Sequence, residues 1–294
     1  IVNSFQVATR IMTDPMASNM NILAIPGMRD TFITDHALGR VKDYGMAIYL
    51  MDILNYDADA TRLFDDSTKK VDVRETSEQF EGRAINNNYA ATYFPDVYLQ
   101  DSVANRPVKM PASIAAIGAL AYNDKVAYPW FAPAGFNRGA LSEVSNTTCR
   151  LNSADRDTLY DARINPIAVF PTGGFVIFGQ KTLQMAKSAL DRVNVRRMLL
   201  EVKRLVVGVA NKLLFEQNNG TTRARFVSQV TPLLALVQAQ AGIEKFTVIC
   251  DDTNNGVEDL ESNRMNGRII VVPTRAVEFI AIDFIITNSG VSFE

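Results

Sequence analysis

In the first half of the chain, apolar runs alternate with stretches whose apolar residues recur at helical spacing. Residues 20–28 and 89–99 are short apolar runs that predict buried strands, and Pro95 inside the second run indicates a sheet edge or a bulge. Over residues 34–54 the apolar side chains recur every three or four positions, which predicts a helix with one apolar face: Ala37, Val41, Tyr44, Ile48 and Met51. Residues 112–122 predict another helix, whose many small side chains permit close packing against a sheet or a second helix.

The second half predicts a strand, two helices and three further strands. The run INPIAVFPTGGFVIFGQKTL at 164–183 predicts a buried strand that leads into a helix of about eight turns over 187–216. The apolar positions of that helix form one continuous stripe: Leu190, Val193, Met198, Val202, Leu205, Val209 and Leu213. A second helix is predicted over 222–240, followed by strands at 246–250, 268–273 and 277–287. This order of elements predicts one mixed sheet in the second half.

Two stretches without clear periodicity set the predicted domain organisation. Residues 55–82 are acidic and predict a loop with short helical pieces, whereas residues 142–162 are polar and irregular, as expected for a connection between domains. We therefore predict two domains, residues 1–150 and residues 151–294, each built from a mixed β-sheet packed with helices. The predicted fold class is α/β to α+β.

Composition and net charge narrow the class of protein only a little. The 294 residues carry a formal net charge of −2, which gives no reason to expect binding to nucleic acid or to an anionic membrane. No apolar run reaches the ~20 residues that a membrane-spanning helix needs. Cys149 and Cys250 fit no metal or redox spacing, and they indicate a reducing compartment. The chain starts at Ile1 and not at methionine, which predicts a fragment of a longer protein that lacks its N-terminal region.

The local distribution of charge is more informative than the total. Residues 52–81 contain nine acidic and four basic side chains, whereas residues 187–225 contain nine basic and three acidic ones. Opposite patches on one subunit suit head-to-tail assembly. Within the basic segment we expect one helix face to contact a neighbouring subunit, with a solvated face or nucleic-acid binding as the alternatives: Arg192, Arg196, Arg197, Lys203 and Arg204.

Two segments imitate ligand-binding loops. GFVIFGQKT at 174–182 nearly matches a phosphate-binding loop, but Gln180 separates the glycine from Lys181 and the four intervening residues are apolar, so a core strand is favoured. DDTNNGVEDLES at 251–262 imitates a calcium loop, but Ser262 replaces the bidentate glutamate, so an acidic surface loop is favoured. Neither segment therefore predicts a cofactor or a metal ion.

His36 is the only histidine of the chain, and it follows Asp35. The members of a Ser-His-Asp triad need only be close in space, so the sequence leaves such a triad open, yet no Gly-x-Ser-x-Gly turn surrounds any serine. The pair stands where a helix is expected to begin. We therefore expect Thr34 or Asp35 to cap that helix.

Several segments, taken in order, resemble contractile tail sheath proteins, which surround the injection tube of bacteriophages and related bacterial machines. Four segments resemble the core domain of that family: NILAIPGM, NNYAATYFPDVYLQD, MPASIAAIGALAYNDK and YPWFAPAGFNRG. Five more resemble its C-terminal domain: INPIAVFPTGGFVIFGQKTL, NVRRMLL, LLFEQNN, FTVICDDTNN and GRIIVVPTRAVEFIAIDFII. Two features depart from the family pattern. Lys181 stands where the family usually has arginine, and the acidic segment 55–82 has no clear counterpart.

The resemblance implies a structural subunit and not an enzyme, with no cofactor and no bound metal. Sheath proteins stack as six-fold rings, arranged helically around the tail tube, and contract to drive the tube through the host envelope. The implied partners are further copies of the chain, the tail tube protein, and baseplate and tail terminator proteins, with no direct binding of nucleic acid and no membrane insertion. The implied location is the virion tail, assembled in the host cytoplasm.

The resemblance also implies which residues join the subunits. In the family, terminal arms add strands to the sheets of neighbouring subunits. Here the candidate arm combines the strand at 277–287 with the tail that follows it: Phe279, Ile280, Ile282, Phe284, Ile286, Val291 and Phe293. The basic helix face would then contact the tube or a neighbouring subunit. The alternative from a different class is an α/β hydrolase or a nucleotide-binding enzyme that uses Asp35 and His36, or Lys181.

Overall fold

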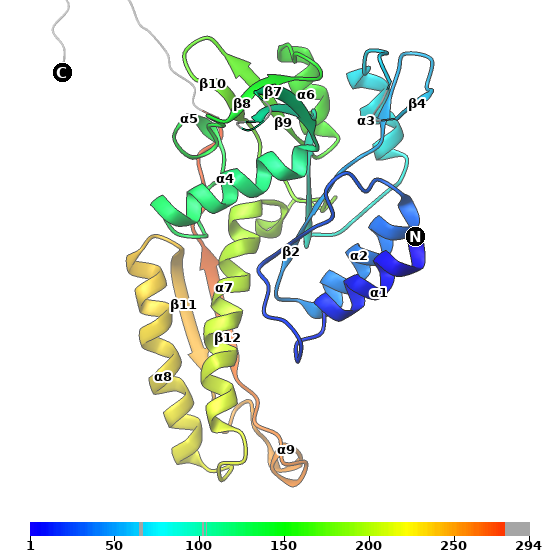
Figure 1. The fold of residues 1–294 in the computed structure, drawn as a ribbon. Coiled ribbons are helices and arrows are strands. Elements are labelled where there is room, and N and C mark those ends of the chain that lie inside the picture. Colours follow the sequence, from blue (N-terminus) through cyan, green and yellow to red (C-terminus); the bar gives the residue numbers. More distant parts are fainter. Residues whose placement is uncertain (65–66, 102, 104, 280–294) are drawn as a thin grey trace, which may run out of the picture.

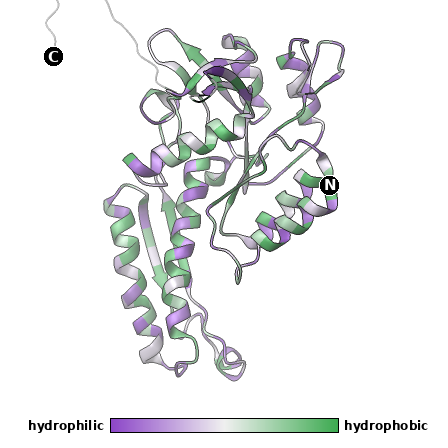
Figure 2. Cartoon of the chain, viewed as in Figure 1, coloured by the Kyte–Doolittle hydropathy of each residue, from purple (hydrophilic) through white to green (hydrophobic). Residues whose placement is uncertain are grey.

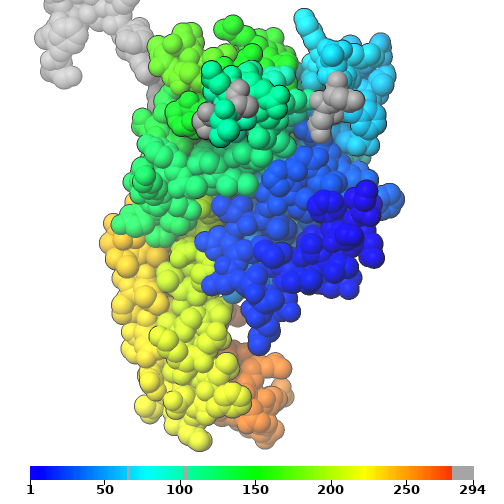
Figure 3. All heavy atoms as spheres, viewed as in Figure 1, coloured from blue at the N-terminus to red at the C-terminus, as the bar shows by residue number. Residues whose placement is uncertain are grey.

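The computed structural model describes most of the chain: residues 1–64, 67–101, 103 and 105–279. Figure 1 shows a broad head, formed by residues 1–192, from which a narrower stalk of residues 193–273 projects. The space-filling view in Figure 3 shows the same division, with the stalk extending below the head. The described parts contain no helix that is both long enough and apolar enough to cross a membrane.

A mixed sheet forms the centre of the head. Its strands lie in the order β1 (Ile22–Ala24), β2 (Ile48–Met51), β5 (Ala90–Phe94), β9 (Ile164–Phe170) and β10 (Gly174–Ile177). The first four strands are parallel, and β10 returns antiparallel to β9. Parallel neighbours need long crossover connections, and here these connections carry α2, α3, α4 and α6, which cover the sheet together with α7.

Strand side chains alternate between the two faces of this sheet, and helices cover both faces. Tyr49 and Met51 pack against α2, α3 and α6 on one face, and Ile48 and Leu50 pack against α4 and α7 on the other. These helices have the following bounds: α2 Thr31–Tyr44, α3 Val73–Glu81, α4 Ala112–Val126, α6 Ser153–Asp161 and α7 Val193–Ala210. The small side chains of α4 lie in this core, so the close packing expected of that helix is confirmed.

The remaining elements of the head are short. A second, antiparallel sheet has the strand order β7-β6-β8, and β3 and β4 form a small hairpin. The bounds are α1 Val2–Met12, β3 Asn55–Tyr56, β4 Arg62–Leu63, β6 Val97–Asp101, β7 Arg106–Met110, α5 Gly135–Arg138, β8 Val144–Thr147 and η1 Ala189–Asp191. The apolar run at 89–99 is thus two strands, with Pro95 after a cis peptide bond between them.

The stalk consists of two long helices and a pair of strands. After α7 come η2 Asn211–Leu213, α8 Gly220–Ala239, β11 Ile243–Ile249, α9 Val257–Glu261 and β12 Arg268–Pro273. Asn219 caps α8, because its side chain accepts a hydrogen bond from the backbone N–H of Thr222 at 2.9 Å. Figure 2 shows apolar and polar residues mixed along both helices, and their apolar residues pack on β11 and β12.

The helix predicted over 34–54 is wrong in its second half. Helix α2 begins at Thr31, where the Asp30 carboxylate caps it by accepting a hydrogen bond from the first turn. It ends at Gly45, whose φ of 63° is a left-handed conformation that glycine adopts readily. Residues 48–51 form β2 instead, because the central sheet buries this strand on both faces.

The single sheet predicted for the second half is also wrong, because its strands divide between two sheets. Residues 164–177 form β9 and β10, with Gly174 at a φ of 64° where the chain reverses, and they join the central sheet of the head. Strands β11 and β12 form a sheet of their own in the stalk. The mixture of helices and several sheets agrees with the predicted fold class. The central sheet spans the predicted boundary at 150/151, and the division into two domains stays a prediction.

Candidate assembly surface

The stalk presents a two-stranded sheet that has room for further strands. Strands β11 and β12 pair antiparallel, with Thr247 opposite Ile270 and Lys245 opposite Val272. Within the described residues neither strand pairs with a third one. Each strand therefore has one edge whose backbone N–H and C=O groups lack a strand partner, and such an edge can accept an added strand.

The two faces of this sheet differ in burial. One face packs into the core of the stalk through Phe246, Val248, Ile269 and Val271. On the other face Ile270 and Val272 remain 51% and 45% exposed. An isolated two-stranded sheet is marginally stable in water, so packing against α7 and α8 has to supply most of its stability. The uncovered face and the two free edges are the parts that a neighbouring chain can reach.

Trp130 joins the stalk sheet to the head. Its indole Nε1 donates a hydrogen bond to the backbone oxygen of Gln240 at 2.9 Å, just before β11, and its ring stacks on Tyr128. Asn194 at the start of α7 donates to the backbone oxygen of Trp130 at 3.3 Å. The aromatic turn of the head thus contacts the stalk at two places, the start of α7 and the connection between α8 and β11.

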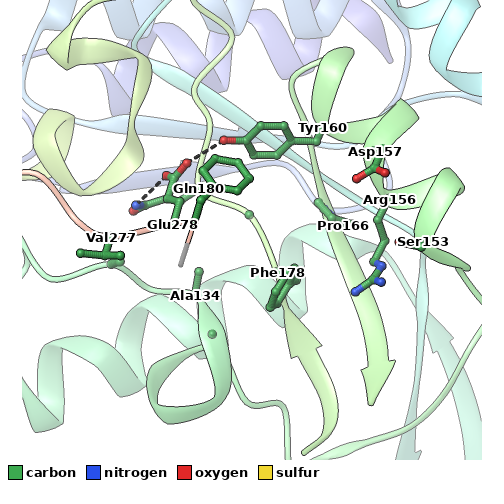
Figure 4. Close-up of a pocket in the computed structure, with 14 residues that line it drawn as sticks. Ala134, Ser153, Arg156, Asp157, Tyr160, Pro166, Phe178, Gln180, Val277 and Glu278 are labelled. Carbon is green, nitrogen blue, oxygen red and sulfur yellow. Dashed lines mark hydrogen bonds between the residues drawn. The ribbon is translucent and has the colours of Figure 1, made fainter. Parts of the chain in front are cut away.

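The segment after β12 returns to the head, where Glu278 anchors it. One carboxylate oxygen accepts from Gln180 Nε2 at 3.1 Å and from Arg192 Nε at 2.6 Å. The other accepts from the Tyr160 hydroxyl at 2.6 Å and from Arg192 Nη2 at 2.9 Å. Figure 4 shows Tyr160 and Gln180 reaching Glu278 beside a cavity of about 330 Å³. Three parts of the head thus hold one side chain of the outgoing segment.

Burial and hydrogen bonding act in opposite directions on this carboxylate. Burial by itself would raise the pKa of Glu278, but hydrogen bonds from Tyr160 and Arg192 outweigh it and hold the pKa below its ordinary value. Burial raises the pKa of the Tyr160 hydroxyl, and the adjacent carboxylate raises it further. At neutral pH the phenol therefore stays a donor and the carboxylate stays an acceptor.

Two of the five residues of the basic helix face are buried inside the fold. Arg196 and Arg197 are only 6% and 5% exposed, which leaves little of either side chain for the expected contact with the tube or a neighbouring subunit. Arg196 Nε donates to the backbone oxygen of Asn88 at 3.1 Å, and its guanidinium lies over the Tyr89 ring. Arg197 pairs with Asp124 on α4 at 2.5 Å. Both cations attach α7 to the head of the same chain.

The other three basic residues also contact their own chain, but they are less buried. Lys203 Nζ donates to the backbone oxygen of Gly45 at 2.9 Å. Arg204 pairs with Glu201 at 2.9 Å and donates to the backbone oxygen of Met46 at 3.1 Å, while Arg192 holds Glu278. The contact of Arg192, Lys203 and Arg204 with a tube or a neighbouring subunit stays a prediction.

The predicted inter-subunit arm falls mostly outside the described residues. Phe279 is 80% exposed, and its ring meets the Tyr160 ring edge-on with the centroids 6.3 Å apart. Residues 277–279 form no strand, so the predicted strand at 277–287 does not begin where the sequence places it. The other arm residues lie outside the described part of the chain: Ile280, Ile282, Phe284, Ile286, Val291 and Phe293.

The segment that imitates a phosphate-binding loop is part of the central sheet. Residues 174–177 form β10 and not an open loop. Lys181 Nζ donates to the backbone oxygen of Tyr160 at 2.6 Å and lies over the same ring, so it is used inside the fold. The calcium-like segment 251–262 contains the short helix α9, and the described residues include no cluster of three or more His, Cys, Asp or Glu side chains able to hold a metal.

Asp35 and His36 show no arrangement of a catalytic pair. Asp35 forms an ion pair with Arg83 at 2.6 Å, and both Asp35 and His36 lie inside α2. The expectation that Thr34 or Asp35 caps this helix is wrong, because Asp30 does so four to five residues earlier.

Comparison of sequences gives a consistent set of relatives. No family model matches the chain. The tail sheath protein of Vibrio phage KVP40 is 38% identical over 209 residues, which cover 71% of this chain and 30% of that protein. The tail sheath protein of Enterobacteria phage T4 is 34% identical over 212 residues, which cover 71% of this chain and 32% of that protein. The chain thus spans about a third of the length of these curated relatives.

Comparison of structures gives the same family of folds. The baseplate structure of the anti-feeding prophage contains a chain that matches with a TM-score of 0.71 at 20% identity, covering 90% of this chain and 68% of that one. The PVC sheath complex, an extracellular contractile injection system in the contracted state, matches with a TM-score of 0.71 at 18% identity, covering 97% of this chain and 80% of that one. The sequence relatives and the structural matches together confirm the resemblance to contractile tail sheath proteins.

Proposed function

Starting from this homology to tail sheath proteins, we propose that the protein acts as a structural subunit of a contractile tail sheath. The observation that carries the proposal is the open two-stranded sheet of the stalk, from which a C-terminal segment departs. A strand-accepting edge and a strand-donating segment on one chain allow copies to link into a continuous polymer. The named relatives are sheath proteins and not enzymes, which favours this role over a hydrolase or a nucleotide-binding enzyme.

The linkage proceeds by strand addition. The arm of one subunit supplies an extended segment, and the free edge of β11 or β12 in a neighbour supplies the backbone partners. Backbone hydrogen bonds give strength without demanding particular side chains, so the linkage tolerates sliding and tilting of the subunits. The apolar residues of the arm beyond Phe279 lie beside the exposed apolar residues of the accepting sheet and shield them from water: Ile280, Ile282, Phe284, Ile286, Val291 and Phe293.

The assembled sheath consists of six-fold rings stacked helically around the tail tube, with baseplate and tail terminator proteins at its ends. Contraction changes the contacts between subunits while each subunit moves nearly as a rigid body. The closed core of the head suits such a movement, because close-packed interiors resist continuous deformation. The tube or a neighbouring subunit contacts the partly exposed Arg192, Lys203 and Arg204. The sheath is part of the virion tail and assembles in the host cytoplasm, and no cofactor, nucleic acid or membrane takes part.

The test is electron microscopy of the full-length protein and of two truncations. Deleting residues 280–294 should abolish ordered tubes, because no strand remains to enter the neighbouring sheet. Deleting only residues 288–294 is the graded control and should leave shorter or less regular tubes. Circular dichroism of both truncations should match the full-length protein. Regular tubes of normal length from the larger deletion would contradict strand donation by this arm.

A further inference from the structure

The path of the chain between β12 and the arm depends on one side chain. After Pro273 the chain leaves the stalk sheet, and the exposed Val277 shows how little it packs. Within residues 275–279 every hydrogen bond that the structure describes ends on the Glu278 carboxylate. Phe279 adds an edge-on ring contact with Tyr160. The root of the arm is therefore held at one point.

We propose that Glu278 is the positioning residue of the arm, tying the root of the arm to the head of its own subunit. A pull from a neighbouring subunit that holds the arm then passes into the head and not into the two-stranded sheet. The inference rests on the proposed function, because it takes the residues after Phe279 to be gripped by another copy. Beyond that function, the inference names the residue through which a pull on the arm is transmitted to the subunit that donates it.

The stalk sheet alone is a weak place to apply such a force. A pull on the end of β12 at Pro273 would open the β11–β12 pairs one after another, starting with the pair of Ile243 and Pro273. When a pulling force acts on one hydrogen-bonded pair after another, the pairs break one at a time. A sheet of only two strands is also marginally stable. Without an anchor, the arm would peel the strand to which it is attached.

A pull on the arm would instead act on all the hydrogen bonds of the Glu278 carboxylate at the same time. Its partners come from three separate parts of the head: Tyr160 from the last turn of α6, Gln180 from the loop after β10, and Arg192 from the N-cap of α7. Charge-assisted hydrogen bonds of this kind are stronger than neutral ones, and the paired contact of Arg192 also fixes the orientation of the carboxylate. The force is thereby shared among three segments that flank the central sheet.

Packing contributes little to this anchor. Cavities of about 330 Å³ and about 820 Å³ lie beside it, and both are lined in part by Tyr160 and Glu278. Val277 and Phe279 on either side of Glu278 are 78% and 80% exposed, so only the Glu278 side chain of this segment is mostly covered. Because the hydrogen bonds carry the attachment, a substitution of Glu278 alone should release the root of the arm.

The test is single-molecule pulling on the full-length chain, with one handle at the C-terminus and the other at position 125 on the exposed end of α4. In the unchanged protein we expect the first rupture at a well-defined force. E278A should lower that force to half or less, and E278Q should give an intermediate value, because the amide keeps an acceptor but loses the charge. E258Q, which removes the same charge from an exposed position on α9, should leave the force unchanged.

A second pulling geometry separates an anchor from general stabilisation. With both handles in the head, at positions 42 and 125, E278A should rupture at the same force as the unchanged protein. Equal forces for E278A and the unchanged protein in the C-terminal pull would overturn the proposal, and so would an equal loss in both geometries. If E278A fails to fold, E278Q carries the same test. Because pulling uses single chains, its result is independent of whether the protein forms sheath tubes.

Discussion

In the head, helices cover both faces of the central sheet, whereas in the stalk they cover only one face of β11 and β12. Leu50 at the centre of the head is 1% exposed, whereas Ile270 on the stalk sheet is 51% exposed. Both regions contain β-branched strands and amphipathic helices, so composition does not separate them. They differ in how much of the sheet surface remains uncovered by helices of the same chain. Helices of the chain itself bury both faces of the head sheet, whereas one face of the stalk sheet keeps exposed apolar side chains.

Helix α7 belongs to both regions and shows how they are joined. Val193 and Leu200 pack into the core of the head, while Val209 packs into the core of the stalk. Two of the cations between these points, Arg196 and Arg197, are buried against the head, where Arg197 pairs with Asp124. The basic character of α7 is therefore used to fasten an open stalk to a closed head.

The largest effect should come from the core of the head. Leu50→Ala removes a fully buried side chain between the central sheet and α4, and it should lower the free energy of unfolding by about 2–5 kcal/mol. Denaturant unfolding followed by circular dichroism measures the change. A loss below about 1 kcal/mol would mean that the head is less tightly closed than its burial indicates.

The next effect tests the fastening of α7. Arg197→Met keeps much of the side-chain volume but removes the ion pair with Asp124, and it should cost about 2 kcal/mol in the free energy of unfolding. Lys212→Met, at an exposed position just after α7, is the matched control and should change stability by less than about 0.5 kcal/mol. Equal stability of the two variants would show that Arg197 does not fasten the helix.

Acid should act in opposite directions on a buried carboxylate of the head and on the carboxylate that anchors the root of the arm. Burial raises the pKa of Asp52 in the head, so its contribution to stability is present in acid and is lost as the pH rises through its folded-state pKa. The pKa of Glu278 is lowered, so its contribution is present above the ordinary glutamate pKa and is lost as the pH falls through the lower folded-state value. Acidification should therefore loosen the root of the arm while it favours the head.

The opposite effects of pH are measured as two differences in the free energy of unfolding, each between the unchanged protein and one variant, over a series of pH values. The stability of the unchanged protein relative to D52N should fall as the pH rises from about 4, whereas its stability relative to E278Q should fall as the pH drops below about 4.5. Chemical denaturation at a series of pH values gives both profiles. Two profiles with the same sign would contradict the assigned environment of one of the two carboxylates.

The hydrophobic pattern of the sequence predicted the elements that bury only one face, because their apolar residues recur with the period of a helix or a strand. The alanine-rich α4, the apolar stripe of α7 and the β-branched strands β11 and β12 were all visible in the sequence. Strand β2 was not, because Tyr44, Ile48 and Met51 happen to follow helical spacing. A strand buried on both faces has no alternation to mark it, so only the neighbouring strands decide its conformation.

The site was harder to predict, because its groups meet across long separations in the chain. Arg197 and Asp124 lie 73 residues apart, and Glu278 lies 118 residues from Tyr160. A basic helix that faces its own head has the same sequence pattern as one that faces a neighbour. The strands β11 and β12, in contrast, followed from two β-branched runs, although their separation from the central sheet did not. The resemblance to sheath proteins rested on ordered segments that the sequence shows directly.

The smallest effect on the single chain should come from the exposed face of the stalk sheet. Ile270→Thr and Val272→Thr keep β-branched side chains, and both positions lie on the uncovered face, so each should change the free energy of unfolding by about 0.5 kcal/mol or less. The same pair of substitutions should reduce tube formation by the full-length protein, because the apolar face that a neighbouring arm covers becomes polar. Unfolding curves and electron microscopy of the same preparations measure the two effects.

Val248→Thr, on the covered face of β11, is the control with the opposite expectation. It places a hydroxyl in the stalk core and should destabilise the single chain by about 1–3 kcal/mol. Unchanged tubes from the double variant would mean that the exposed face takes no part in assembly, and the contrast between a closed head and an open stalk would then rest on the strand edges alone.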